Sequence, residues 1–168
     1  MTHDTPPSRR RVLASGACCF AGALAGCAGP NASTDESADS TGTTADLDLR
    51  EANVVGVSVE PVGGDYRFDV TLHHDDAGES GYANWWQVER LDGTRLGRRD
   101  LLHPHDEQPF TRSETISVPD GIPCVVVRGH DQTHAYGGQA MLVTLDSGAT
   151  RAVAQGSDPD SFGGADCP

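Results

Sequence analysis

The sequence predicts an all-β fold: an antiparallel, immunoglobulin-like β-sandwich of about seven strands, with a small β-barrel as the alternative. Residues 47–146 show two patterns that indicate it. Apolar and polar side chains alternate over short stretches, as in strands with one buried face. Clusters of Gly, Asp and Pro separate these stretches at the spacing typical of a two-sheet sandwich. No stretch shows a convincing helical repeat of apolar residues.

The expected strands follow from this alternation, in chain order. Val55, Val57 and Val59 mark the first strand, and Tyr66 to Leu72 alternates apolar and polar side chains in the second. Gly63-Gly64-Asp65 supplies the turn between them, because Gly and Asp tolerate the backbone conformations of tight turns. The remaining strands are expected at residues 84–91, 95–102, 112–118, 123–130 and 139–145.

Residues 1–26 predict a twin-arginine lipoprotein signal peptide. Arg9 and Arg10 precede a short apolar stretch that is too short for a membrane-spanning helix of about 20 residues. Leu24-Ala25-Gly26-Cys27 matches a lipobox, so Cys27 is expected to carry lipid. The protein would then be exported and anchored through this lipid to the outer face of the cytoplasmic membrane.

Two further segments are expected to lie outside the core. Residues 27–46 contain no large apolar side chain and predict a disordered tether, in which Asn31 begins a possible glycosylation sequon. Residues 147–168 predict a loose acidic tail. Outside the cell Cys124 and Cys167 can pair in a disulfide, although a core Cys124 with a free Cys167 is the alternative.

The charge balance excludes some partners. The chain has 12 Lys+Arg against 25 Asp+Glu, a formal net charge of −13, and every one of the 12 is Arg. Nucleic-acid binding needs a basic patch, and anionic lipid headgroups attract basic segments, so neither partner is expected. An acidic, lysine-free composition is typical of halophilic proteins, because salt screens the repulsion between carboxylates. An ordinary acidic surface protein is the alternative.

Histidines stand at the ends of several expected strands. His103, His105 and Glu107 alternate along one segment, so in an extended chain their side chains would project to the same side. Imidazole and carboxylate ligands suit Zn, Cu, Fe or Ni. If the loops meet at one end of the sandwich, a transition-metal or small-ligand site is expected there. The candidate metal ligands are His73, His74, His103, His105, Glu107, His130 and His134.

Structural roles for these residues are the main alternative. Pro104 and Phe110 could make their segment a rigid loop. The protein would then be a structural or interaction domain of the cell envelope, contacting an envelope protein through an exposed Trp85 or Trp86. An enzyme is the least favoured reading, because no nucleophile motif or separate general base is recognisable.

The segment 101–113, LLHPHDEQPFTRS, resembles the hallmark of an uncharacterised prokaryotic family of small exported β-domains. The resemblance extends over residues 70–145 and implies that the His-bearing segments belong to one unit. It implies no activity. Further matching positions are His73-His74-Asp75-Asp76, Trp86-x-Val88, Gly93-x-x-x-Gly97, Gly129-His130-Asp131, His134, Tyr136 and Gly137-Gly138.

Overall fold

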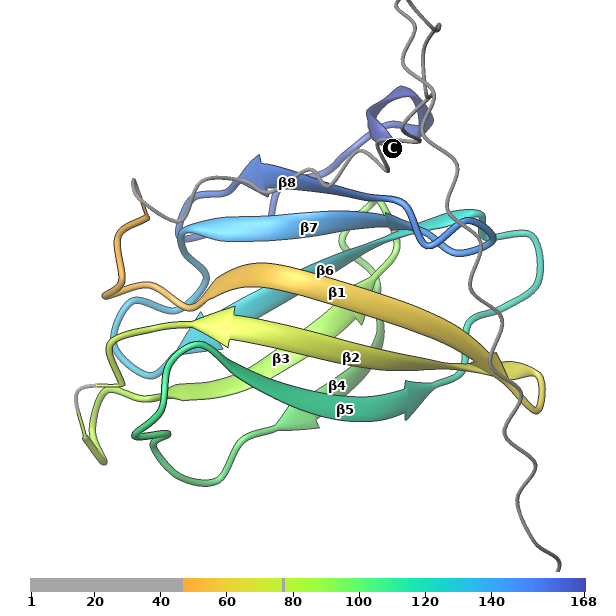
Figure 1. Cartoon of the computed structure of the whole chain (residues 1–168). Coiled ribbons are helices and arrows are strands. Elements are labelled where there is room, and N and C mark those ends of the chain that lie inside the picture. The colour runs from red at the N-terminus through yellow and green to blue at the C-terminus, as the bar shows by residue number, and fades with distance from the viewer. Residues whose placement is uncertain (1–46, 77) are drawn as a thin grey trace, which may run out of the picture. The chain divides into compact units, whose positions relative to one another are not determined.

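The computed structural model describes residues 47–76 and 78–168, and in them two antiparallel β-sheets pack face to face (Figure 1). One sheet has the strand order β1-β2-β5 and the other β4-β3-β6-β7-β8. The predicted all-β sandwich is confirmed, and the sheets do not close into a barrel. The strands are β1 (Asn53–Val62), β2 (Asp65–His73), β3 (Ala83–Glu89), β4 (Arg95–Asp100), β5 (Phe110–Ile116), β6 (Cys124–Asp131), β7 (Gln139–Thr144) and β8 (Thr150–Ala154).

The main core lies between the two sheets and follows the predicted alternation. Phe68, Val70 and Leu72 of β2 are fully buried, and they face Trp86 and Val88 of β3 in the same apolar cluster. Each such side chain contributes about 1.5–3 kcal/mol when it leaves water. Burial on one face of each strand therefore explains why alternation in the sequence locates the strands.

The C-terminal segment differs from the expected loose tail. Residues 150–154 form β8, which pairs with β7 along its whole length, and a short 3-10 helix follows at Gly164–Asp166. Cys124 and Cys167 form a disulfide with a Cα–Cα distance of 6.3 Å. Phe162 and Cys167 pack with Val126 and Leu142 in a second, smaller apolar cluster on the outer face of the five-stranded sheet. This cluster supplies the burial that the composition of the segment does not predict.

A buried ion pair fastens this segment to the sheet. Arg128 and Glu89 have fully buried side chains, and Arg128 Nε donates to Glu89 Oε2 at 2.5 Å. Arg128 also donates from Nη1 to Gln155 Oε1 at 2.5 Å and from Nη2 to the carbonyl of Asp160. These bonds satisfy donors of a guanidinium that would be costly to bury unpaired.

One end of the sandwich, which we call the loop end, is built by four connections. Because the strands alternate in direction, the segment before β1 and the β2–β3, β4–β5 and β6–β7 connections all lie there (Figure 1, left). In the part of the chain that the structure describes, no helix is long and apolar enough to cross a membrane. The predicted signal peptide, lipidated Cys27, sequon at Asn31 and tether lie outside the described residues.

Candidate functional site

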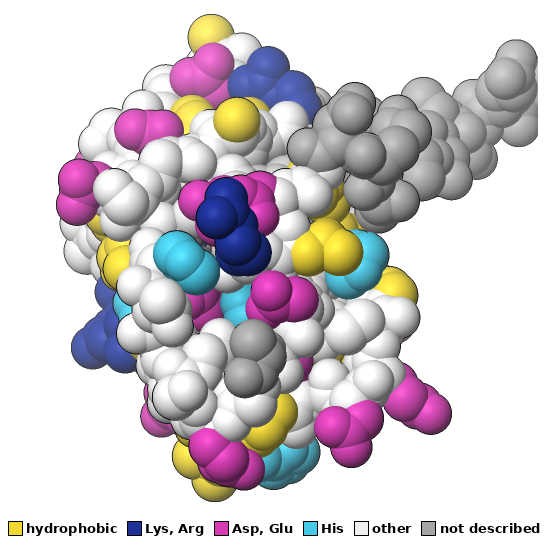
Figure 2. All heavy atoms as spheres, turned by 90° about the vertical axis from the view of Figure 1, so that its left-hand side faces the viewer, with side chains coloured by type: hydrophobic (Ala, Val, Ile, Leu, Met, Phe, Trp, Pro, Cys, Tyr) yellow, Lys and Arg dark blue, Asp and Glu magenta, His cyan; other side chains and the backbone are white. Residues whose placement is uncertain are grey.

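The loop end gathers the predicted histidines. His73 and His74 end β2, His103 and His105 lie between β4 and β5, and His130 and His134 end or follow β6. On this face the imidazoles form separate patches among Asp, Glu and Arg side chains (Figure 2). Residues 47–76 and 78–168 contain no group of three or more His, Cys, Asp or Glu side chains that could hold a metal ion. The expected gathering at one end therefore occurs, but the rings do not converge on a common point.

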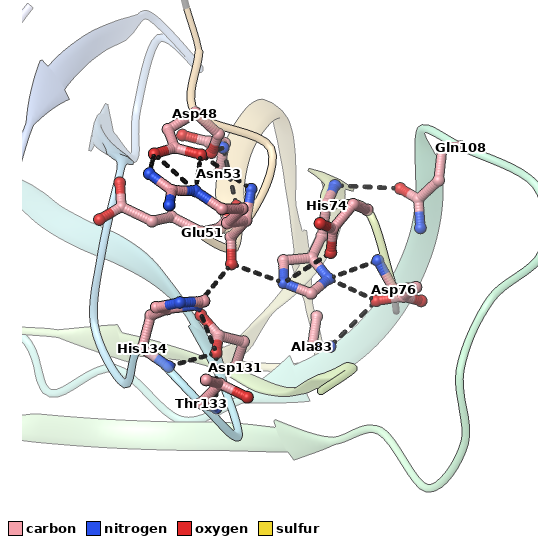
Figure 3. A network of polar contacts seen from close by, with 12 residues as sticks. Asp48, Glu51, Asn53, His74, Asp76, Ala83, Gln108, Asp131, Thr133 and His134 are labelled. Carbon is pink, nitrogen blue, oxygen red and sulfur yellow. Dashed lines mark hydrogen bonds and ion pairs between the residues drawn. The ribbon is translucent and has the colours of Figure 1, made fainter. Parts of the chain in front are cut away.

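Two of the rings bind the same backbone carbonyl. His74 Nε2 lies 3.0 Å from the carbonyl oxygen of Arg50, and His134 Nδ1 lies 2.9 Å from it (Figure 3). A carbonyl oxygen only accepts hydrogen bonds, so each of these nitrogens carries the proton. Asn53 Nδ2 donates to two other carbonyls of the segment before β1, at 2.8 Å each. The two imidazoles and the amide thus hold this segment against the β2–β3 and β6–β7 connections.

Asp76 joins three connections through one carboxylate. Its side chain is 2% exposed, and its Oδ1 lies 2.7 Å from His74 Nδ1. The same Oδ1 accepts the backbone N–H of Ala83 at 3.0 Å, and Oδ2 accepts the backbone N–H of His105 at 2.6 Å. Asp76 has a φ of 41°, in the left-handed region that Asp tolerates better than most residues. Sequence reasoning did not select Asp76, although an Asp directly after a strand is a known acceptor for turn N–H groups.

Gln108 and Asp131 hold the β2–β3, β4–β5 and β6–β7 connections through further hydrogen bonds to backbone groups. Gln108 Oε1 accepts the backbone N–H of His74 at 3.1 Å, and its Nε2 donates to the carbonyl of His105 at 3.2 Å. Asp131 is fully buried, and its Oδ1 accepts the backbone N–H groups of Thr133 and His134 at 2.7 and 2.6 Å. Each connection of the loop end is therefore tied by side-chain bonds to its own or a neighbouring backbone.

The His103-x-His105-x-Glu107 segment is only partly as expected. The rings of His103 and His105 lie together, with centroids 4.9 Å apart, but His105 is buried and stacks on Phe110 at 3.7 Å. His103 and Glu107 are exposed, and His103 Nδ1 bonds to the carbonyl of Pro104 at 2.8 Å. Burial lowers the pKa of His105, and the nearby Arg112 guanidinium lowers it further.

His130 stacks on Trp85, with ring centroids 4.0 Å apart, and its Nδ1 lies 2.7 Å from Asn84 Oδ1. The guanidinium of Arg98 lies over the Trp85 ring at 3.7 Å, a cation–π contact. Trp85 is therefore only 8% exposed, and Trp86 is fully buried. The expectation that one of them forms an exposed docking face is wrong, because these neighbours and the core cover both rings. Burial also lowers the pKa of His130.

A hollow of about 400 Å³ opens between the edge strands β4 and β5; we call it the arginine hollow. Arg99, Arg112 and Glu114 line it with side chains on the inner faces of the sheets; Arg98 and Asp100 also line it, but they lie on the outer face of β4, opposite Gln87 and Trp85. Arg99 Nη1 pairs with Glu114 Oε2 at 3.4 Å. Among the described residues, neither Arg98 nor Arg112 has a carboxylate partner. Sequence reasoning missed these arginines, whose only signal is three cations close to the His-rich segment of an acidic chain.

The sequence is similar to one named relative. A protein of Halomicrobium mukohataei named "Putative lipoprotein" is 67% identical over 126 residues, which cover 74% of this chain and 63% of the relative. The chain thus spans less than two thirds of that relative's length. No protein-family model matches the sequence, and no solved structure matches it. The chain is therefore similar, at high identity, to a protein named as a lipoprotein, which is consistent with the lipidation expected at Cys27.

Proposed function

We propose that the chain is an exported lipoprotein, held by a lipid on Cys27 at the outer face of the cytoplasmic membrane, whose loop end binds a small anionic ligand. The lipobox before Cys27 and the arginines before the apolar stretch support the anchoring. The similarity to a protein named as a lipoprotein also supports it.

The observation that carries the binding function is the arginine hollow in a fixed frame. Asp76 accepts the backbone N–H of His105 and Gln108 donates to its carbonyl, so the β4–β5 connection that lines the hollow is held in place before a ligand arrives. A preformed site loses less conformational entropy on binding than a flexible one. The Arg112 guanidinium, which has no carboxylate partner among the described residues, supplies planar donors suited to an anion in the hollow.

In this proposal the histidines build the loop end and hold no Zn, Cu, Fe or Ni. A metal ligand needs a free ring nitrogen lone pair. His74 and His134 each donate from one ring nitrogen to the carbonyl of Arg50, and the Nδ1 of His74 faces Asp76. His74 thus has both ring nitrogens engaged, so recruiting it to a metal would break bonds that hold the segment before β1.

The alternative is a protein-interaction domain without a ligand site. Leu102, at the rim of the arginine hollow, is 82% exposed and is the most exposed large apolar side chain of the described residues. An envelope protein covering Leu102 would explain this exposure. Such a partner would contact the rim without needing the arginines inside.

Metal analysis and anion titration of the tag-free full-length protein test the proposal. We expect far less than one equivalent of metal, and we expect acetate, phosphate or sulfate to shift backbone amide resonances around the arginine hollow at constant ionic strength. Stoichiometric metal that is lost in His74→Gln would contradict the structural role of the histidines. Anions that shift no resonance of β4 or β5 would contradict the binding function.

A further inference from the structure

We propose that the arginine hollow binds a monocarboxylate that carries an apolar group. This inference rests on the proposed anion-binding function and names the class of ligand. Three properties of the hollow point to it: its charge, its apolar rim and the free donors of Arg112.

The charges in the hollow fit a single negative charge. On the inner faces Arg99 and Arg112 are opposed by Glu114, which leaves one net positive charge. A monoanion neutralises this excess, whereas a dianion such as phosphate or sulfate would be repelled more strongly by the Glu114 carboxylate. The hollow therefore favours a carboxylate over the divalent anions.

Arg112 is the central donor for this ligand. It comes from β5 and is half-buried, and its Nη1 donates to the carbonyl of Thr111 at 2.7 Å. Its guanidinium keeps further N–H donors, and no carboxylate of the described residues pairs with them. The planar guanidinium binds a carboxylate through two parallel hydrogen bonds, which a lysine could not match.

The rim of the hollow is apolar on one side. Leu102 is 82% exposed beside the arginines, directly after the buried Leu101. The stacked rings of His105 and Phe110 lie on the other flank of the β4–β5 connection. A ligand whose carboxylate reaches Arg112 can therefore cover Leu102 with an alkyl or leucine-like group.

The contact between Arg98 and Trp85 offers a fluorescence signal for ligand binding. Its guanidinium lies 3.7 Å from the Trp85 ring and donates from Nη2 to Gln87 Oε1 at 2.7 Å. A ligand that displaces Arg98, which also lines the hollow, would change the surroundings of Trp85. Tryptophan fluorescence should thus report binding without a label.

A purely protective role of the same charges makes a different prediction. Charged side chains that point inward on edge strands prevent pairing with other chains. If Arg99, Arg112 and Glu114 serve only this purpose, removing one charge should cause self-association and leave ligand binding unaffected.

The test is a titration of the full-length protein with hexanoate, acetate and phosphate, followed by fluorescence and by amide resonances. At 1 M KCl the Debye length is about 3 Å, so only direct contacts should retain affinity. We expect saturable hexanoate binding, with acetate and phosphate at least tenfold weaker. Arg112→Gln should weaken hexanoate at least tenfold. The matched control Arg95→Gln, at an exposed position of the neighbouring edge strand β4 outside the hollow, should leave it unchanged.

Leu102→Ser serves as a second variant, because an 82% exposed side chain contributes little to folding. It should remove the preference for hexanoate over acetate. N-acetyl-leucine and its amide show whether the natural carboxylate comes from a peptide C-terminus or from a free organic acid. If N-acetyl-leucine binds more tightly than hexanoate, a peptide C-terminus is indicated. If it binds more weakly, a free organic acid is indicated. The amide should not bind.

The outcomes separate this inference from the proposed function. Phosphate binding as tightly as hexanoate, or an equal loss in Arg95→Gln and Arg112→Gln, would overturn the monocarboxylate inference and leave an anion-binding domain. Self-association of Arg112→Gln with intact hexanoate affinity would assign the arginine to edge protection. If no anion binds, both the inference and the proposed function fail.

Discussion

Replacing Asp76 with Asn should destabilise the domain more than any other change of one side-chain atom at the loop end. The Asp76 carboxylate accepts two backbone N–H groups and contacts His74 Nδ1, with its side chain 2% exposed. Asn tolerates the left-handed φ of 41°, so the substitution removes an acceptor and adds no backbone strain. Its amide has one oxygen, so at least one buried N–H of Ala83 or His105 must face an NH₂ group.

The cost can be worked from these bonds. Hydrogen bonds to charged groups contribute about 1.5–3 kcal/mol, and an unsatisfied buried donor costs about 1–3 kcal/mol. We therefore expect a loss of about 3 kcal/mol in the free energy of unfolding. With a urea dependence of about 1.5 kcal/mol per M, the unfolding midpoint should fall by about 2 M. Urea denaturation followed by circular dichroism measures it.

Asp75 supplies the matched control. Its side chain is 43% exposed and lies 3.8 Å from His74 Nε2, so Asp75→Asn should cost less than about 0.5 kcal/mol. Equal losses in the two variants, or a change below about 0.5 kcal/mol in Asp76→Asn, would refute the view that Asp76 ties the connections together.

Two further predictions concern pH and packing. Burial lowers the pKa of His105 and His130 below the ordinary 6.5, so the folded domain binds protons less readily than the unfolded chain. The free energy of unfolding should have its highest value above about pH 6.5 and fall as the pH drops below it. Urea midpoints from pH 8 to pH 5 measure this dependence, and His130→Gln should reduce its slope. A pH-independent midpoint would argue against it. Gly129→Ala would press a Cβ against the carbonyl of Ala52, so the thermal unfolding midpoint of this variant should fall clearly. Gly156 has open space around it, so Gly156→Ala should leave the midpoint unchanged. Similar midpoints for the two variants would be inconsistent with this close approach.

The strands could be predicted because one face of each is buried. Tyr66 to Leu72 alternates so regularly that its side chains indicate both the strand and its inner face. The strand β8 could not be predicted, because Ala152 and Val153 are its only apolar residues besides the terminal Ala154. Its stability comes from pairing with β7, and the path of the segment after it is fixed by Phe162 and the disulfide. These are long-range contacts that composition does not encode.

The candidate site was predictable in its location and not in its contacts. Histidines at the ends of antiparallel strands and in their connections gather at one end by topology alone. The partner shared by His74 and His134 is a backbone carbonyl, that of Arg50, which leaves no signal in the sequence. The arginine hollow depends on β4 and β5 being edge strands on the same side of the sandwich, which only the sheet order reveals.

The protonation sites of His74 and His134 test most directly whether the histidines build the loop end. Long-range proton–nitrogen correlation spectra of the imidazoles at pH 8 distinguish the two ring nitrogens. The structure requires a proton on Nε2 of His74 and on Nδ1 of His134, because both nitrogens donate to the carbonyl of Arg50. Equimolar Zn²⁺ should leave both sets of signals unchanged. The mixture of protonation states of a free imidazole at both positions, or zinc-induced loss of these N–H protons, would contradict the structural role of these rings.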